Sequence, residues 1–401
     1  MTRVDVLIVG AGAAGMMCAI EAGRRGRSVR VIDHARSPGE KIRISGGGRC
    51  NFTNLGTGPG NFLGENPRFA VSALKRFTQH DFVKRVDAAG IAWHEKTLGQ
   101  LFCDDSAKLI IRMLTDDMKA AGVELSLGVA VERVERVGDG FEVALSDGGT
   151  VRCGSLVVAT GGKSIPKMGA TGWAYDIARQ FGLRVTETRP ALVPLTFEAG
   201  LLEQTQPLAG VAVDASVSVT PSSRPKDGRA TFNEAMLFTH RGLSGPAILQ
   251  ISSYWREGEA ITVAMAPGTD VFASLKAAKE ENGKQMVQTA LGHILPRRLA
   301  DSVLAREAVS GKLAEVGDKV LRRLDGAVNA WTVKPVGSEG YRTAEVTLGG
   351  VDTAALDQQT MQATAVPGLF FIGEAVDVTG WLGGYNFQWA WSSGWAAGQA
   401  V

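Results

Sequence analysis

The sequence predicts an α/β fold in which one domain is divided into two segments by an inserted module. Three observations indicate this arrangement. The chain opens with a strand–turn–helix–strand pattern, the glycine-rich β texture of that opening returns near the end, and the sequence between them differs from both. At 401 residues the chain is also longer than one ordinary domain.

The first elements form a βαβ unit. Residues 4–9 are almost wholly apolar, as in a buried parallel strand, and residues 13–26 place small and apolar side chains at helical spacing. Residues 28–32 form the second expected strand, which ends at Asp33. Together these elements have the length of about 30 residues that is typical of one βαβ unit.

The first segment of the divided domain is expected to run to residue 190. It contains expected helices at 67–89 and 107–121, a strand-like stretch at 123–137 and a buried strand at 156–159. The insert, 191–344, is expected to be mainly β over 191–268 and mainly helical over 269–335, from its change of periodicity. Residues 345–401 form the second segment.

Composition and charge disfavour several classes of protein. The net charge of the chain is +2, and the insert holds 17 basic and 16 acidic residues. Neither the whole chain nor the insert therefore carries enough positive charge to attract nucleic acid or an anionic membrane strongly. The four cysteines form no C-x-x-C pair, which indicates a reduced, cytoplasmic protein without a metal site. We expect no signal peptide, and no apolar run approaches the ~18 residues of a membrane span.

The strongest local motif is Gly10-x-Gly12-x-x-Gly15. It follows a strand and opens a helix, and Asp33 ends the next strand. In this context the first glycine makes the tight turn, the second lets the backbone approach a pyrophosphate, and the third lets helix and strand pack closely. Asp33 would accept hydrogen bonds from an adenosine ribose, while the helix N-terminus supplies N–H donors to the phosphates. The alternative, a glycine-rich turn without a ligand, does not require this context.

The C-terminal part of the chain favours FAD over NAD as the dinucleotide. Gly373-Glu374 follows an expected strand, and flavoproteins of this fold use such an acid on the ribityl chain or a phosphate. Thr160-Gly161-Gly162 is a matching glycine turn after the strand at 156–159. Three separated glycine turns on one domain suit an extended dinucleotide.

Two further glycine-rich stretches are expected at the flavin. Residues 41–51 combine three consecutive glycines with Lys41, Arg43 and Arg49, which suits the diphosphate and the polar edge of the flavin ring. Gly383-Gly384 precedes an expected helix whose N-terminus would stabilise negative charge on the reduced ring. The alternative for the first stretch is an exposed flexible loop. Three tryptophans follow the second stretch, and simple core packing is the alternative for them; they are Trp389, Trp391 and Trp395.

The expected site comprises one candidate catalytic residue and a set of residues expected to bind the cofactor. His240 is the candidate general acid or base in the insert, with a purely structural role as the alternative. Cys50 has no partner cysteine near it in the sequence and is expected to line the flavin pocket rather than act as a redox thiol. The residues expected to bind the cofactor are Gly10, Gly12, Ala13, Ala14, Gly15, Asp33, His34, Lys41, Ser45, Gly46, Gly47, Gly48, Arg49, Cys50, Asn51, Val129, Thr160, Gly161, Gly162, Gly373, Glu374, Gly383, Gly384, Tyr385 and Asn386.

Three long motifs in this order resemble the HI0933-like flavoproteins, which are bacterial FAD-binding oxidoreductases. They are SGGGRCN at 45–51, LFTHRGLSGPAILQIS at 237–252, and the stretch from TLGGVD at 347–352 to GWAAG at 394–398. The resemblance implies a glutathione-reductase-like FAD domain in two segments, with an inserted β-barrel-like module and a small helical module. The chain departs from the family at Asp33-His34, where glutamate is usual, and at Gln100, where arginine is frequent.

The resemblance implies hydride transfer at the flavin N5 atom. The leading hypothesis is a reductase of an activated C=C bond, in a steroid-like acid or in a uracil base of RNA. NADH or NADPH would bind transiently as electron donor, because the sequence has no second G-x-G-x-x-G. The alternatives are an amine oxidase of the aminoacetone oxidase type that produces peroxide, and a non-catalytic flavin-dependent module that binds RNA or the ribosome.

Overall fold

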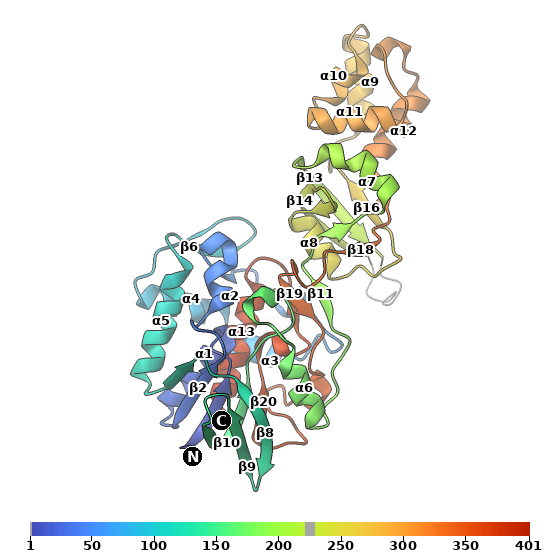
Figure 1. Cartoon of the computed structure of the whole chain (residues 1–401). Coiled ribbons are helices and arrows are strands. Elements are labelled where there is room, and N and C mark those ends of the chain that lie inside the picture. The colour runs from blue at the N-terminus through green and yellow to red at the C-terminus, as the bar shows by residue number, and fades with distance from the viewer. Residues whose placement is uncertain (1, 221–228) are drawn as a thin grey trace. The chain divides into compact units, whose positions relative to one another are not determined.

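The computed structural model describes residues 2–220 and 229–401 (Figure 1). It divides into two compact units. Unit 1 comprises the chain up to Arg189 together with Val346–Val401, and unit 2 comprises Pro190–Glu345. Each boundary lies one residue from the position expected from the sequence.

The central sheet of unit 1 is mainly parallel, which confirms the expected α/β fold of the Rossmann type. Its order is β7-β2-β1-β10-β9-β8, and β20 also pairs with β10. The strands β7, β2, β1, β10 and β20 run parallel to their neighbours in this group. Strand β9 pairs antiparallel with the first half of β10, and β20 pairs with its second half. The bounds are β1 (Thr2–Val9), β2 (Val29–Asp33), β7 (Glu124–Leu127), β8 (Val131–Val137), β9 (Gly140–Leu145), β10 (Thr150–Val158) and β20 (Leu369–Phe371).

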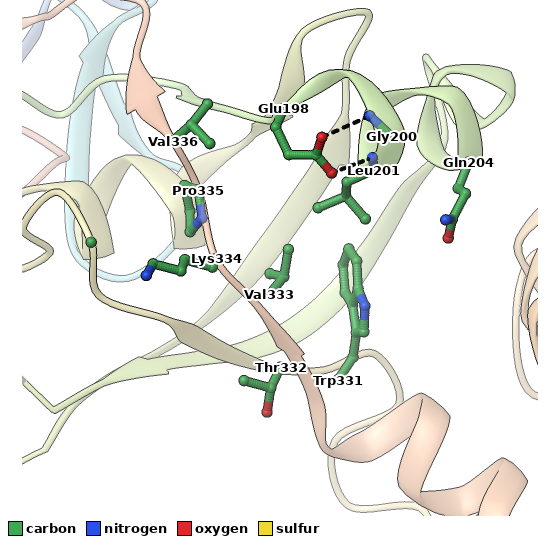
Figure 2. A pocket seen from close by; sticks show the side chains of 11 residues that line it. Glu198, Gly200, Leu201, Gln204, Trp331, Thr332, Val333, Lys334, Pro335 and Val336 are labelled. Atoms are coloured by element: carbon green, nitrogen blue, oxygen red, sulfur yellow. Dashed lines mark hydrogen bonds between the residues drawn. The ribbon is translucent and has the colours of Figure 1, made fainter.

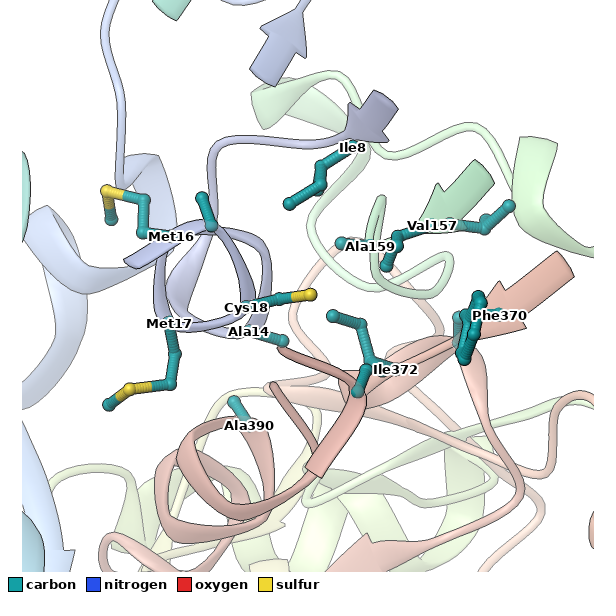
Figure 3. Packing of buried hydrophobic residues seen from close by; sticks show 14 of the residues in the cluster. Ile8, Ala14, Met16, Met17, Cys18, Val157, Ala159, Phe370, Ile372 and Ala390 are labelled. Carbon is teal, nitrogen blue, oxygen red and sulfur yellow. The ribbon is translucent and has the colours of Figure 1, made fainter. Parts of the chain in front are cut away.

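The first and last helices of the chain pack together in the core of unit 1. Figure 3 shows side chains of α1 (Ala13–Arg24) gathered with those of α13 (Tyr385–Gly398) and of strands β1, β10 and β20. Glycines let the two helices approach: a Cβ on Gly394 would lie 2.4 Å from the Ala14 carbonyl oxygen. Arg25 Nη1 also donates to the Val401 carbonyl at 2.8 Å. The C-terminal helix is therefore part of the same core as the first βαβ unit.

Two expected elements of unit 1 are each divided in the structure. The expected helix at 67–89 is broken at Phe77, because Thr78 caps a new helix by accepting the Asp81 N–H. The expected strand at 123–137 is β7 and β8, separated by Gly128 at φ 73°. The remaining elements of unit 1 are α2 (Glu40–Ile44), η1 (Ser45–Gly48), β3 (Asn51–Asn54), η2 (Pro59–Asn61), β4 (Phe62–Leu63), α3 (Val71–Arg76), α4 (Gln79–Ala88), β5 (Trp93–Glu95), β6 (Gln100–Cys103), α5 (Ala107–Ala120), η3 (Pro166–Met168), α6 (Trp173–Gln180), β19 (Val346–Leu348), η7 (Thr353–Ala355), η8 (Gly373–Ala375) and β21 (Thr379–Gly380).

Among its described residues, unit 2 contains a seven-stranded antiparallel sheet and a group of helices. The sheet order is β17-β16-β13-β14-β15-β12-β18. Its two end strands are separated by only residues 334–336, so the sheet curls back on itself as in a barrel. The elements are β12 (Leu195–Thr196), α7 (Ala199–Thr205), η4 (Gln206–Leu208), β13 (Ala212–Val219), β14 (Ala230–Phe238), β15 (Gly242–Ser244), α8 (Pro246–Ser252), β16 (Ile261–Ala264), α9 (Val271–Glu281), α10 (Val287–Leu291), α11 (Arg297–Arg306), η6 (Leu313–Glu315), α12 (Asp318–Asn329), β17 (Trp331–Val333) and β18 (Gly337–Ser338). Strand β11 (Arg189–Ala191) lies where the chain passes from unit 1 to unit 2.

In the part of the chain that the structure describes, no helix has the length and apolar character needed to cross a membrane.

Candidate functional site

The three glycines of the first loop have three different environments. Gly10 has φ +114°, and a Cβ on it would lie 2.5 Å from the Ala159 carbonyl oxygen. A Cβ on Gly15 would lie 1.9 Å from the Gly10 carbonyl oxygen, so this glycine sets the distance between α1 and β1. A Cβ on Gly12 would meet no protein atom within 4 Å. The open face of the loop is therefore at Gly12, beside the N-terminus of α1, where a pyrophosphate would approach.

Asp33 holds this loop against the end of β2. Its Oδ2 accepts the Ala11 N–H at 2.7 Å, and its Oδ1 accepts the Ala35 N–H at 2.8 Å. A carboxylate has about four acceptor positions, so these two bonds leave capacity for a ribose hydroxyl. The shorter aspartate thus reaches the backbone of the phosphate loop, a role that the motif did not reveal.

Two other expected residues lie beside the end of β2. Val129 donates its N–H to the Asp33 carbonyl at 3.0 Å. The exposed ring of His34 lies over Gly169, since a Cβ on that glycine would come within 2.1 Å of His34 Nε2. These contacts bring the β2 end, the segment before β8 and the turn at 166–169 together.

The glycine turn after β10 carries a buried polar atom without a partner. Thr160 Oγ1 is buried and has no hydrogen-bond partner among the described residues. Gly161 has φ +73° and no protein atom within 4 Å of a Cβ built on it, whereas Gly162 packs against Thr347 and Glu374. A buried hydroxyl without a partner is unusual, so this turn has the chemistry of a ligand contact.

Glu374 and Lys41 bind each other. Lys41 Nζ donates to Glu374 Oε2 and to Ser164 Oγ, both at 2.6 Å. The Ser164 hydroxyl donates to Glu374 Oε1 at 2.7 Å, and the Thr347 N–H donates to the same oxygen at 3.0 Å. Sequence motifs assigned Glu374 and Lys41 separately to the cofactor, and they did not indicate Ser164 or Thr347. These four residues, named the Glu374 clamp below, connect four separate segments of the chain by hydrogen bonds.

The loop at 45–50 consists largely of residues in the left-handed region. Gly46, Gly47 and Gly48 have φ values of 56°, 67° and 87°, and Cys50 has φ 54°. No protein atom lies within 4 Å of a Cβ built on Gly47 or Gly48, so their backbone faces open space. Ser45 Oγ donates to the Ile42 carbonyl at 2.8 Å, and the exposed Arg49 follows the glycines. The loop is thus a folded turn that leaves the backbone of Gly47 and Gly48 open.

The thiol of Cys103, which is distant in the sequence, lies near that of Cys50, and both are free cysteines. The Cys103 N–H donates to the Arg49 carbonyl at 3.0 Å, which brings β6 alongside Cys50. Burial raises the pKa of the Cys50 thiol, and Cys103 raises it further. Burial likewise raises the pKa of Cys103, to about 12. Both cysteines are reduced and protonated near neutral pH.

The turn before α13 is held by β3 and β6. A Cβ on Gly383 would lie 2.8 Å from Gln100 Cδ, and one on Gly384 would lie 2.4 Å from the Thr53 carbonyl oxygen. The Asn386 side chain is bound to the backbone of Gly380 and Trp381, so only its backbone N–H belongs to the helix N-terminus. Tyr385 is buried beside it and its ring makes an edge contact with Phe62.

Two of the three tryptophans of α13 are core residues, as the packing interpretation expects, and the half-buried Trp395 packs against the core. Trp389 and Trp391 are buried, and their ring N–H groups donate to the Gly373 and Phe52 carbonyls at 2.9 and 2.8 Å. Trp391 stacks on Phe82 with ring centroids 4.2 Å apart. These bonds connect the helix to η8 and β3 at the candidate site.

The expected cofactor residues of unit 1 thus lie on connected segments. The Gly39 N–H donates to the Ala11 carbonyl, Lys41 joins Glu374, and the Cβ position of Gly373 lies 3.0 Å from Ala14 Cβ. The open face at Gly12 and the unpartnered oxygen of Thr160 fit an extended dinucleotide. FAD bound here would supply hydride transfer at its N5 atom.

His240 lies in unit 2, at the turn between β14 and β15. Thr239 Oγ1 accepts the N–H groups of Arg241 and Gly242, at 3.2 and 3.1 Å. The turn is therefore ordered by Thr239, and the exposed His240 side chain makes no hydrogen bond to the residues that the structure describes. The bonds that order this turn are therefore made by Thr239, and the role of the His240 side chain stays a prediction.

Unit 2 also contains an open hollow of about 710 Å³ along β17 (Figure 2). Its charged lining residues are Glu198 and Lys334. The Glu198 carboxylate accepts the Gly200 and Leu201 N–H groups, both at 2.8 Å, and so caps α7. The hollow therefore brings together no set of groups for acid–base or redox chemistry.

Comparisons with known proteins agree with the fold. The family model described as "HI0933-like protein Rossmann domain" matches residues 4–400. The chain is 51% identical to "Ribosomal RNA dihydrouridine synthase" of Escherichia coli, over 100% of this chain and 98% of that protein. It is 43% identical to the protein of the same name from Haemophilus influenzae, over 98% of each chain. It is 28% identical to "3-dehydro-bile acid delta(4,6)-reductase" of Clostridium scindens, over 100% of this chain and 99% of that one. The chain therefore belongs to the HI0933-like family and is an FAD-dependent oxidoreductase.

Proposed function

We propose that this protein reduces the C5=C6 bond of a uracil base in ribosomal RNA and so forms dihydrouridine. The observation that carries the proposal is the full-length identity of 51% and 43% to two proteins named for that product. The steroid-like class of substrate has weaker support, from a relative at 28% identity. Both fall within the reduction of an activated C=C bond.

The reaction needs a hydride and a proton at adjacent carbons. The C5=C6 bond of uracil is conjugated with the C4 carbonyl, so hydride adds at C6 and a proton at C5. FAD, once reduced, supplies the hydride. Residues of unit 1 would hold it: the open backbone at Gly12 for the pyrophosphate, and the N-terminus of α13 for negative charge on the reduced ring.

His240 is the proposed proton donor. Histidine has an ordinary pKa near 6.5, which suits proton donation near neutral pH. A histidine for comparison is the exposed His94 of unit 1, whose Nδ1 lies 2.7 Å from Asp104 Oδ1. NADH or NADPH is the proposed source of electrons, by transient binding.

The proposal is tested by following the two half-reactions of the purified flavoprotein. The flavin is reduced anaerobically with NADH or NADPH and then mixed with an unmodified ribosomal RNA transcript, with O₂ or with aminoacetone. We expect reoxidation by the RNA and dihydrouridine in its mass spectrum. Peroxide formed from the amine without change in the RNA would favour the amine oxidase. Tight RNA binding without reoxidation would favour the non-catalytic module.

The proton donor is tested with His240→Ala and, as the matched variant, His94→Ala. Loss of the donor should slow reoxidation by RNA by about 100-fold or more and leave reduction by NAD(P)H nearly unchanged. The exposed His240 side chain makes no hydrogen bond to the described residues, so His240→Ala should keep its melting temperature. Equal rates in His240→Ala and the parent protein would reject His240 as the donor.

A further inference from the structure

Asn51 and Gln100 form an amide pair at the candidate flavin site. Asn51 Nδ2 donates to Gln100 Oε1 at 2.9 Å. The carbonyl oxygen of Asn51 is buried, and it has no hydrogen-bond partner among the described residues. The Gln100 amide nitrogen likewise donates to no residue within 2–220 and 229–401. Because a buried acceptor is costly without a donor, this pair has the composition of a recognition site.

The pair is fixed against the turn that precedes α13. A Cβ on Gly383 would lie 2.8 Å from Gln100 Cδ, and one on Gly384 would lie 2.9 Å from Asn51 Oδ1. Asn54 Nδ2 holds the turn from the other side by donating to the Gly383 carbonyl at 2.9 Å. The amides therefore occupy defined positions beside a turn that contributes to the flavin site.

We propose that Asn51 and Gln100 recognise an imide edge, in which an N–H group adjoins a carbonyl. The Asn51 oxygen accepts the N–H, and the Gln100 nitrogen donates to the carbonyl. The pair depends on glutamine at position 100, because an arginine there has no acceptor for Asn51 Nδ2. If the uracil of the RNA is the molecule recognised, the pair favours a pyrimidine substrate, because a steroid-like acid carries no imide.

The imide edge has two sources in the proposed reaction, namely the pyrimidine ring of the flavin and the uracil of the RNA. Recognition of uracil rests on the proposed function, because it requires RNA to be the substrate. Recognition of the flavin requires only that FAD binds at the candidate site. Methylation at N3 removes the N–H from either molecule and leaves the rest of the ring unchanged. It therefore identifies which molecule is recognised.

The flavin arm measures binding of FAD and of 3-methyl-FAD to the full-length apoprotein by flavin fluorescence, without turnover. If the pair holds the flavin, FAD should bind about tenfold or more tightly than its methylated form. Asn51→Leu should abolish this preference. Gln100→Glu keeps an oxygen that accepts from Asn51 but loses the N–H donor. It should weaken FAD binding by a similar factor. Gln180→Glu is the matched control, because Gln180 donates to the Val134 carbonyl elsewhere in unit 1.

The RNA arm measures direct binding of a uridine oligonucleotide and of its 3-methyluridine form to the FAD-loaded protein. If the pair holds uracil, the preference appears here and is lost in the same two variants. If the wild type distinguishes neither methylated molecule, or if Asn51→Leu and Gln100→Glu both keep its preferences, the inference is overturned. Failure to form dihydrouridine would reject the proposed function alone, since both binding arms are independent of turnover.

Discussion

Replacement of Gly12 by valine should remove FAD binding while leaving the fold intact. Gly12 caps α1 with φ −84° and ψ −172°, an extended conformation that valine adopts without strain. A Cβ there meets no protein atom within 4 Å. The side chain would instead fill the space in front of α1, where a pyrophosphate must approach.

The size of the effect follows from the bonds that the helix N-terminus offers. The N–H groups of Ala13, Ala14 and Gly15 precede the first intrahelical bond, from the Met16 N–H to the Gly12 carbonyl at 3.0 Å. Loss of two charge-assisted bonds, each worth roughly 1.5–3 kcal/mol, weakens FAD binding by more than about 100-fold. Valine as N-cap costs roughly 1 kcal/mol of helix stability, which lowers the melting temperature of the apoprotein by only about 2 °C.

Gly317 provides the matched control. It caps α12 in unit 2 with φ −75° and ψ 157°, and it also has no atom within 4 Å of a Cβ position. Gly317→Val should therefore lower the melting temperature as Gly12→Val does but retain FAD. Fluorescence titration of the two apoproteins with FAD measures the difference. Normal FAD affinity in Gly12→Val, or equal loss in both variants, would refute the placement of the pyrophosphate.

Two further predictions concern the clamp and the cysteines. Glu374→Gln removes the ion pair with Lys41 and should weaken FAD binding up to about tenfold. Glu142→Gln removes the Glu142–Arg152 pair at the surface and should leave the Kd for FAD unchanged. Equal Kd values for the two variants would show that the Glu374 clamp does not support FAD binding. Burial raises the pKa of Cys103 and of Cys153 from 9.0 to about 12, so the unfolded chain releases these protons first as the pH rises above about 9. The free energy of unfolding in urea should then fall by roughly 1.4 kcal/mol per pH unit for each thiol as the pH rises. Cys103→Ala should reduce this slope. An unchanged slope in the variant would contradict the raised pKa of Cys103.

The parts of the site that sequence predicted are those whose roles are local. The spacing of Gly10, Gly12 and Gly15 between a strand and a helix assigns each glycine a distinct geometric role, and the structure has the close contacts and the open face in that order. The parallel strands could be expected for the same reason, because short apolar runs bounded by glycines are typical of buried strands. Local pattern and local backbone geometry agree in these elements.

The residues that sequence missed act through contacts between distant segments. Ser164 and Thr347 carry no motif of their own, and they matter because they meet Glu374 and Lys41. Cys103 reaches Cys50 only through the pairing of β6 with β3. By contrast, the break before α4 had a local signal, since Thr78 and Asp81 have the spacing of a capping box.

The contacts of the two segments show that the candidate cofactor site is built from both ends of the chain. Gly394 packs on the Ala14 carbonyl, and Glu374 joins Lys41, so residues beyond 345 complete the loops that residues 10–51 begin. The insert of unit 2 separates these halves by more than 150 residues in sequence. Closing so long a loop costs entropy that the α1–α13 interface and the strand pair β10–β20 must offset. The small residues of α13 make that interface close, and the same helix begins at the turn that contacts Asn51 and Gln100. Core packing and the candidate flavin site therefore share one helix, which joins the last segment of the chain to the first βαβ unit.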